Sequence, residues 1–447
     1  MFISSELSFY IISLGCSKNL VDSERINGEM VSAGFIPAET SENSDIIIIN
    51  TCGFIQPAKE ESIEVILDAV SIKESGASGS KHFRHGNGEH RSFSRKVVVT
   101  GCLSKRYFNE ILSEIPEIDF LYGIPDEKFV SVMSNEFNIK TGSITVKRKK
   151  LYNSYPYSYI KISDGCSNNC SYCAIPLIRG PHSPISAEKI LKDAEAEVAG
   201  GSLELNIIAQ DIAVYKWGEI NLSSLINKMS GIARLRWIRL LYCHPDHITD
   251  DIINLIAGNE KVVPYIDIPF QHVSKSILKS MGRDGNINKY FDLLSRLREK
   301  IPGITVRSTF MIGYPGEGED EFRELVHFVK TARLDKVGCF IYSPEEGTAA
   351  AGLPDTVSID EKNRRLDQLM RVQADISREI LDDKIGLELD VLVEEKIDDN
   401  TYIGRTESDA PEVDGVFYLT AGENRINDIV RAHVTDSVEY DLIGVMI

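Results

Sequence analysis

Short apolar segments that alternate with helical patterns constrain the fold of this chain more than any other feature. The central part, residues 152–384, holds six such segments with helical patterns between them. They cover residues 159–162, 203–209, 237–242, 265–269, 305–312 and 337–342. Polar residues follow their carboxyl ends, which is where a β/α barrel carries its chemistry. We therefore predict an α/β fold with a partial (β/α)6 barrel, closed by a long polar helix over about 359–384.

The N-terminal part, residues 1–146, shows the same alternation with shorter strands. Apolar runs at 9–14, 45–50 and 96–100 are separated by helical patterns such as 59–70. Buried runs of this length between helices are typical of an open parallel sheet. Residues 76–94 are rich in Gly, Ser, His and Arg, which indicates an exposed insertion. Its histidines could bind a metal, although a solvated loop is the favoured interpretation; they are His82, His85 and His90.

The last part, residues 386–447, changes to short strands punctuated by Gly and Pro. From Leu387 to Val393, apolar residues alternate with mostly acidic ones, as in a half-buried strand. We expect a small antiparallel barrel here. This part holds 15 Asp and Glu against 4 Lys and Arg, so it carries −11 of the chain's net charge of −18. Such a surface would attract a basic protein and repel phosphate.

Length and composition exclude several classes of protein. The 447 residues contain no apolar run near the ~20 residues that a membrane helix needs. The stretch from Ser13 to Cys16 faintly resembles a lipoprotein cleavage site, but the basic leader is missing, so we expect a cytoplasmic protein. The net charge argues against a broad nucleic-acid footprint. Eight cysteines are too sparse for a disulfide scaffold.

Three cysteines form the motif with the most chemical information. Cys166, Cys170 and Cys173 have C-x3-C-x2-C spacing directly after a predicted strand. Thiolates bind iron–sulfur clusters, and a tight loop lets three of them reach three irons of one cluster. The fourth iron then keeps an open position, as a catalytic metal requires. Zinc is the alternative, but a structural zinc ion requires a fourth ligand, and His182 does not follow at the spacing usual in zinc fingers.

A second set of cysteines follows the N-terminal strands. Cys16, Cys52 and Cys102 each come at once after one of the three apolar runs. In an open parallel sheet, the loops after the strands gather along one edge. The three thiols can therefore converge although 36 and 50 residues separate them. One buried thiol would be unremarkable, but three at equivalent places predict a metal site.

The cysteine loop on a barrel-like chain resembles the radical S-adenosylmethionine (SAM) superfamily, and the whole chain is similar to its methylthiotransferase branch. Members of that branch combine a three-cysteine N-terminal domain, a radical domain and a C-terminal TRAM module. The resemblance implies two 4Fe-4S clusters and SAM as cofactors, with Cys16, Cys52 and Cys102 holding the second cluster. SAM would then serve as radical source and as methyl donor. The family's usual Ser-Arg-Pro after the cysteine loop is Ser183-Pro184 here, which leaves open what replaces that Arg.

Within this branch, several stretches look like those of enzymes that add a methylthio group to the β-carbon of an aspartate of ribosomal protein uS12. They are residues 13–24, 207–211, 267–272 and 409–415. The acidic terminal part favours the same basic partner. A tRNA adenosine methylthiotransferase is the alternative enzyme, and a non-catalytic electron-transfer scaffold is a third hypothesis. The sequence names neither an electron donor nor a sulfur donor.

The remaining expectations concern contacts with SAM. Gly200 and Gly201 precede the second central strand, where superfamily members often bind the cofactor's amino group, but a helix C-cap would explain the pair equally well. Gln271 and His272 end a strand on the expected side, so a cofactor or substrate role is favoured over a structural one. Two further cysteines are expected to lie in the core, Cys243 and Cys339.

Overall fold

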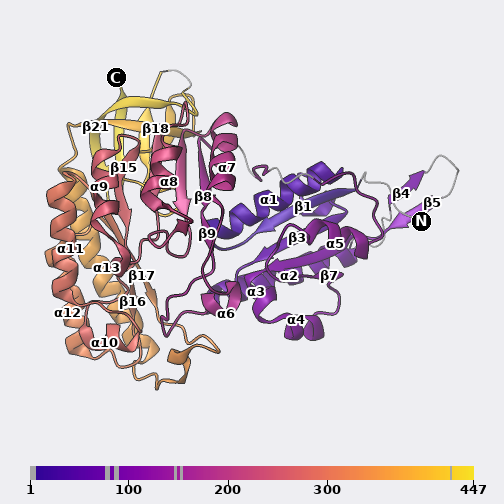
Figure 1. Cartoon of the computed structure of the whole chain (residues 1–447), viewed down its shortest axis with the longest axis horizontal. Helices are drawn as coiled ribbons and strands as arrows, with labels where there is room; N and C mark the ends of the chain where they lie inside the picture. The colour runs from indigo at the N-terminus through magenta and orange to yellow at the C-terminus, as the bar shows by residue number, and fades with distance from the viewer. Residues whose placement is uncertain (1–6, 76–80, 85–89, 145–147, 152–154, 423–424) are drawn as a thin grey trace. The chain divides into compact units, whose positions relative to one another are not determined.

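The computed structural model describes residues 7–75, 81–84, 90–144, 148–151, 155–422 and 425–447 (Figure 1). The chain divides into two compact units, each considered by itself. Unit 1 comprises residues 1–153 and 174–180, and unit 2 comprises residues 154–173 and 181–447. No helix in the described part of the chain is long and apolar enough to cross a membrane. The expected division at 1–146, 152–384 and 386–447 stays a prediction.

Unit 1 is built on a parallel sheet with strand order β2-β1-β3-β6-β7. The three predicted strands are confirmed as β1 (Ser8–Ser13), β3 (Ile46–Thr51) and β6 (Lys96–Gly101), and β2 (Ile36–Pro37) and β7 (Phe120–Leu121) lie at the edges. The helices are α1 (Ser17–Ala33), α2 (Gln56–Ser75), α3 (Cys102–Arg106), α4 (Phe108–Glu114) and α5 (Phe129–Glu136). Ile46 and Ile48 pack into one core, while Ile47 and Ile49 pack into another. Successive strand residues point to opposite faces, so an unbroken apolar run marks a strand buried on both.

The insertion at 76–94 lies partly outside the described residues. The backbones of β4 (Lys81–Arg84) and β5 (His90–Phe93) pair as an antiparallel hairpin. The side chains of His82, His85 and His90 are outside the described part, and so are residues 76–80 and 85–89. The expectation for these histidines therefore stays untested.

Unit 2 contains an open parallel sheet of six strands in the order β17-β16-β15-β14-β11-β8. The six predicted strands are confirmed as β8 (Tyr157–Lys161), β11 (Glu204–Ile208), β14 (Trp237–Leu240), β15 (Val262–Asp267), β16 (Thr305–Ile312) and β17 (Lys336–Ile341). Their helices are α7 (Ala187–Ala199), α8 (Leu222–Met229), α9 (Asp250–Gly258), α10 (Lys275–Ser280), α11 (Ile287–Lys300) and α12 (Glu319–Ala332). The predicted long helix is confirmed as α13 (Ile359–Asp382). One apolar core runs between the sheet and these helices.

The C-terminal part of unit 2 is a closed five-stranded barrel in the order β18-β19-β20-β22-β21. Its strands are β18 (Glu388–Lys396), β19 (Thr401–Arg405), β20 (Phe417–Thr420), β21 (Ile429–Val438) and β22 (Asp441–Met446). The expectation of a wholly antiparallel barrel needs one correction, because β20 and β22 pair in parallel. β22 returns antiparallel to β21 and closes against β20, so it runs in the same direction as β20.

The 405–415 segment, which links β19 to β20, lies against the first residues of the central strands. A carboxylate of Glu204, at the start of β11, is 2.6 Å from Arg405. Farther along, the Tyr265 hydroxyl donates to Asp414 at 2.7 Å, and Lys336 donates to Asp409 at 2.7 Å. This segment therefore covers the amino ends of the sheet and leaves the carboxyl ends to the loops that carry chemistry.

Candidate active site

The structure brings the three N-terminal cysteines to one edge of the unit 1 sheet. Cys16 precedes α1, Cys52 follows β3, and Cys102 begins α3 directly after β6. Because β1, β3 and β6 are parallel neighbours, their carboxyl ends meet at the same edge. Cys52 and Cys102 are buried, whereas Cys16 is exposed.

Close backbone packing positions these thiols. Gly15 has a left-handed φ of +83°, and a Cβ at this position would lie 2.7 Å from the Sγ of Cys52. Glycine is therefore required both by the backbone and by the thiol. Asn19 joins two strand ends, because its amide donates to the carbonyls of Leu14 at 2.9 Å and Thr51 at 3.0 Å. Its oxygen lies 3.6 Å from the Sγ of Cys102.

Arg179 supplies positive charge to this cysteine site. Its guanidinium, 2% exposed, donates to Asn19 at 2.7 Å and pairs with Asp22 at 3.1 Å. Although the residue Cys16 is exposed as a whole, desolvation of its thiol raises the thiol pKa, but Lys18, the backbone amide of Asn19 and Arg179 together lower that pKa on balance. Burial, joined by the charges of Cys102 and Cys16, raises the pKa of Cys52 to about 12. This mutual effect is what three neighbouring thiols produce, and a cation or cluster would relieve it.

The second cysteine set lies in the loop that follows β8 and β9 (Ser163–Asp164). Cys166, Cys170 and Cys173 are all half-buried. The Sγ of Cys166 accepts from the backbone N–H of Asn168 at 3.4 Å, and the N–H of Cys173 donates to the Cys170 carbonyl at 3.1 Å. The loop is thus folded tightly at the carboxyl ends of the strands, on the side opposite the 405–415 segment.

An acid–imidazole pair lies beside this loop. Asp211 follows β11, and its Oδ2 is 2.6 Å from Nδ1 of His247 and 3.2 Å from the Asn168 amide nitrogen. Burial raises the pKa of Asp211, but the hydrogen bond to His247 outweighs burial and lowers it. The same hydrogen bond raises the pKa of His247. By contrast, burial and then the charge of Arg283 lower the pKa of neighbouring His244 to about 3, so this ring is neutral.

The expected SAM contacts lie at two different ends of the sheet. Gly200 ends α7 as its C-cap, and Gly201 follows with a φ of +111°. Both come just before the start of β11, next to the start of β8, where the carbonyl of Pro156 accepts from Leu203. That is the amino end of the sheet, away from the cysteine loop, so the helix C-cap explains this pair and the cofactor role is not supported.

Gln271 and His272 lie at the carboxyl end, as expected, but in different environments. Gln271 has a left-handed φ of +68°, and its buried Oε1 has no hydrogen-bond partner in the described part of the chain. An unpartnered buried acceptor fits a site that receives a donor from a ligand. His272 is fully buried, with Nδ1 accepting from Ser274 at 3.0 Å and Nε2 3.5 Å from Glu317. His272 Nε2, like Gln271 Oε1, has no hydrogen-bond partner among the described residues, so a cofactor or substrate role for His272 stays a prediction.

Within the described residues, no three Cys, His, Asp or Glu side chains converge closely enough to hold a single metal ion. A four-iron cluster spreads its thiolates over separate irons, so its ligands need not converge on one point. The donor chemistry of both sets, three thiols without a fourth ligand, fits a cluster better than zinc. Cys243 lies in the core as expected, and Cys339 is half-buried in β17.

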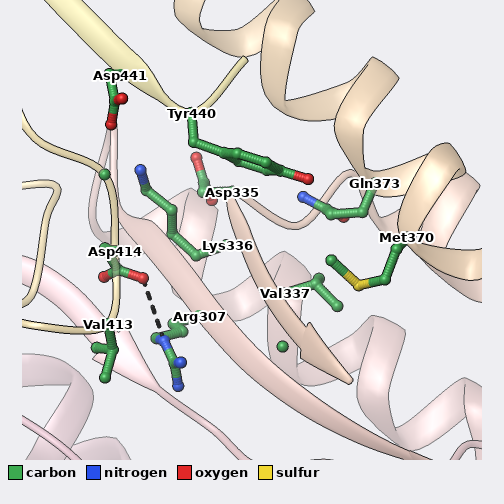
Figure 2. A pocket seen from close by; sticks show the side chains of 12 residues that line it. Arg307, Asp335, Lys336, Val337, Met370, Gln373, Val413, Asp414, Tyr440 and Asp441 are labelled. Carbon is green, nitrogen blue, oxygen red and sulfur yellow. Dashed lines mark hydrogen bonds and ion pairs between the residues drawn. The ribbon is translucent and has the colours of Figure 1, made fainter. Parts of the chain in front are cut away.

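A hollow of about 390 Å³ lies at the other end of the sheet (Figure 2). It is bordered by the starts of β16 and β17, by α13 and by loops of the C-terminal barrel. Its cations are already paired, Arg307 with Asp414 at 3.2 Å and Lys336 with Asp409 at 2.7 Å. A hollow with neutralised charge at the amino ends of the strands is not a candidate for the reaction site.

Sequence reasoning missed several residues that surround the two sets of cysteines. Arg179, Asn19 and Arg283 carry no motif of their own, and His247 was not connected with Asp211. Asn19 lies three residues after Cys16, within the 13–24 stretch, which was the only available signal. The others are recognised only through contacts between segments distant in sequence.

Three family matches cover most of the chain. Residues 8–123 match a family described as "Uncharacterized protein family UPF0004". Residues 160–329 match the radical SAM superfamily, and residues 385–447 match the TRAM domain. Together with the cysteine loop at the carboxyl ends of the parallel strands, these matches define a radical SAM enzyme.

Curated relatives identify the branch. The chain is 40% identical to a "Ribosomal protein uS12 methylthiotransferase RimO" from Geobacter sulfurreducens, over 98% of both chains. It is 37% identical to the protein of the same name from Clostridioides difficile, again over 98% of both chains. The chain therefore belongs to the ribosomal protein uS12 methylthiotransferase (RimO) family.

Among solved structures, the chain is similar to the radical SAM methyltransferase TsrM from Kitasatospora setae, determined with cobalamin and a [4Fe-4S] cluster bound. The TM-score is 0.55 at 12% identity, over 87% of this chain and 81% of that one. A second TsrM structure, with tryptophan and a SAM analogue, gives a TM-score of 0.53. At this identity the likeness concerns the fold.

Proposed function

We propose that this chain methylthiolates the β-carbon of an aspartate in ribosomal protein uS12. The observation that carries the proposal is family membership along the full length, together with two sets of three cysteines at the carboxyl ends of two parallel sheets. The tRNA alternative is not favoured, because the full-length relatives carry the uS12 name. Since uS12 is ribosomal, the enzyme would work in the cytoplasm.

The six cysteines divide into two proposed ligand sets. Cys166, Cys170 and Cys173 would hold the 4Fe-4S cluster of the radical domain, and the second 4Fe-4S cluster would be held by Cys16, Cys52 and Cys102. When bound, the radical cluster and SAM supply a radical able to take hydrogen from an unactivated carbon. Each set offers three thiols, which leaves one iron open for a non-protein ligand.

Side chains around the cysteine loop would orient what binds there. Asp211 accepts from Asn168 and thereby fixes the loop between Cys166 and Cys170. The buried, unpartnered oxygens of Gln210 and Gln271 face no donor among the described residues and are available to polar groups of SAM. We assign Gln271 a cofactor contact, and we assign none to Gly200 or Gly201.

The acidic barrel would attract a basic protein. Some of its carboxylates are neutralised internally, as Asp409 is by Lys336 and Glu394 by Arg405. Others are exposed to solvent, namely Glu388, Glu395, Asp398, Asp399, Glu412, Asp428, Asp436 and Glu439. Exposed like charges raise the encounter rate with a basic partner, and the effect weakens with added salt.

The test compares two substrates on enzyme with both clusters rebuilt. Purified enzyme, SAM, a reductant and a sulfide source are incubated with uS12 or with tRNA, and each product is examined by mass spectrometry. We expect a methylthio group on one aspartate of uS12 and no change in tRNA. Modified tRNA adenosine with untouched uS12 would refute the proposal. The Cys339→Ala variant, which alters a thiol outside both sets, serves as the matched control.

A further inference from the structure

A turn that carries no sequence motif holds the loop from Cys166 to Cys173 in place. Residues 280–283 begin at the last residue of α10, and two of their carbonyls accept from Ser171, which lies between Cys170 and Cys173. The Ser171 backbone N–H donates to Met281 at 2.9 Å, and its hydroxyl donates to Ser280 at 2.8 Å. The turn therefore holds the middle of the cysteine loop through both backbone and side chain.

Glycine makes the close contact possible. Gly282 has a φ of +72°, and a Cβ at this position would lie 2.5 Å from the carbonyl oxygen of Asn169. No other residue allows this backbone to approach the loop so closely. The next residue, Arg283, is thereby placed directly beside the cysteines.

Arg283 is a buried cation with neutral partners. The residue is 7% exposed, and its guanidinium donates to the Tyr172 hydroxyl at 3.2 Å and to the Pro269 carbonyl at 2.7 Å. In the described part of the chain, no carboxylate lies within ion-pair distance of it, and its Nε has no hydrogen-bond partner. Burying a charge without a counter-ion costs several kcal/mol, so a folded protein that does this has a use for the charge.

Among the groups that interact electrostatically with Arg283 is the thiol of Cys170, which becomes anionic when it binds a metal. Burial would lower the pKa of Arg283, but its interactions with Tyr172 and then with Cys170 raise that pKa on balance. Tyr172 stands between Cys170 and Cys173 in the sequence, and its hydroxyl is one of the two groups that Arg283 holds. Three thiolates make a bound cluster net negative, and one added electron makes it more so.

We propose that Arg283 is the built-in counter-charge of the radical cluster, held by the 280–283 turn to make that cluster easier to reduce. Arg283 is a positioning residue for charge, and the inference rests on the proposed ligand set Cys166, Cys170 and Cys173. A fixed cation lowers the free energy of the reduced form more than that of the oxidised form, so it raises the reduction potential.

The test measures the potential of one cluster at a time. In the full chain carrying Cys16→Ala, Cys52→Ala and Cys102→Ala, the remaining cluster is rebuilt and titrated by EPR-monitored potentiometry without SAM. Arg283→Gln should shift the midpoint to a more negative value, and Arg283→Lys should retain most of the parent value. Arg296→Gln, at an exposed ion pair on α11, is the control and should leave the midpoint unchanged.

Each outcome decides between stated alternatives. An unchanged midpoint in Arg283→Gln overturns the inference, and weaker SAM binding alongside it would assign the cation to the cofactor's carboxylate. If Arg283→Gln holds no iron, retention of iron by Arg283→Lys supports the charge role, and loss of iron in both overturns it. A parent chain that assembles no cluster on Cys166, Cys170 and Cys173 would instead refute the proposed function.

Discussion

Two glycines, Gly15 and Gly282, each bring backbone against a cysteine site. Gly15 lies against the Sγ of Cys52, and Gly282 lies against the loop between Cys166 and Cys173. Both adopt left-handed φ angles, which cost other residues about 1–2 kcal/mol. At the scale of single residues, the sites therefore depend on the absence of a Cβ at these two glycines as well as on the thiols.

Gly15→Ala should displace Cys52 and impair the unit 1 site. The added Cβ would lie 2.7 Å from Sγ, so either the thiol or the turn must move. We expect a lower iron content after cluster assembly, with about half of the iron lost if this site empties while the other fills. Iron analysis beside thermal unfolding measures this. Gly258→Ala, where a Cβ meets nothing within 4 Å, is the control, and equal iron in both variants would contradict the expectation.

Replacing the two sets of cysteines should abolish different steps of the reaction. Replacing Cys166, Cys170 and Cys173 by Ala should reduce 5′-deoxyadenosine formation to the level without enzyme. Replacing Cys16, Cys52 and Cys102 should spare SAM cleavage but abolish methylthiolation. Chromatography of the nucleoside and mass spectrometry of uS12 separate the two effects. Loss of cleavage in the second variant as well would show that the two sites are not separable.

At the scale of elements, parallel strands collect reactive groups at one end, and the loops there are cross-linked by polar contacts. Asp211 follows β11, His247 follows β14, and Asn168 belongs to the loop after β8. One carboxylate thus ties three consecutive βα connections together. No single connection contains the information for this arrangement, because each partner comes from another strand.

The Asp211–His247 pair predicts a pH window for stability. Because the pKa of His247 is raised in the folded state, its contribution to the free energy of unfolding is complete below about pH 6.5. This contribution is lost as the pH rises through the folded-state pKa. Because the pKa of Asp211 is lowered in the folded state, its contribution to the free energy of unfolding is complete above about pH 3.9. This contribution is lost as the pH falls through the folded-state pKa. His247→Gln should therefore destabilise most between these values, as urea unfolding at several pH values would show.

Exposed His327 on α12 provides the comparison for this window. His327→Gln should change stability little at any pH. If His247→Gln lowers the free energy of unfolding by the same amount from pH 5 to well above the folded-state pKa, the imidazolium charge does not contribute to stability.

At the scale of the whole molecule, a buried charge network joins the C-terminal barrel to the central sheet within unit 2. Arg405 pairs with Glu204 at 2.6 Å, and Glu204 also pairs with Arg239 at 2.8 Å. These three side chains are at most 1% exposed. Burial raises the pKa of Glu204, but Arg405 and then Arg239 lower it on balance, so the carboxylate stays charged.

Arg405→Met should destabilise unit 2 strongly. Removal of Arg405 leaves Glu394 without its ion-pair partner and Glu204 with Arg239 alone, and breaking a buried pair costs about 3–5 kcal/mol. Arg431→Met, at a solvent-exposed pair with Asp390, should change the free energy of unfolding far less. Denaturant unfolding of both variants measures the difference, and equal midpoints would show that the network does not stabilise the contact.

The 409–415 stretch shows where sequence patterns mislead. It is one of the stretches that resemble uS12-modifying enzymes, and it belongs to the acidic C-terminal part that was expected to attract a basic protein. In the structure, Asp409 is turned toward Lys336 at the start of β17, and Asp414 is turned toward Tyr265 in β15 and Arg307 in β16. These two carboxylates hold the barrel in place, and Glu412 is the exposed acidic residue of this stretch.

Local patterns in the sequence were enough to locate the parallel strands, the long helix α13 and the two cysteine sets. Strand burial and the carboxyl-end rule depend on a few consecutive residues, so they can be read without the fold. The tertiary structure alone decided the parallel pairing of β20 with β22, the place of Gly200 and Gly201 at the amino end of the sheet, and the presence of Arg179 and Arg283 beside cysteines. These features depend on contacts between distant segments. Arg179 and Asn19 are 160 positions apart, and Arg283 and Tyr172 are 111 positions apart, so a single sequence carries no local signal for them.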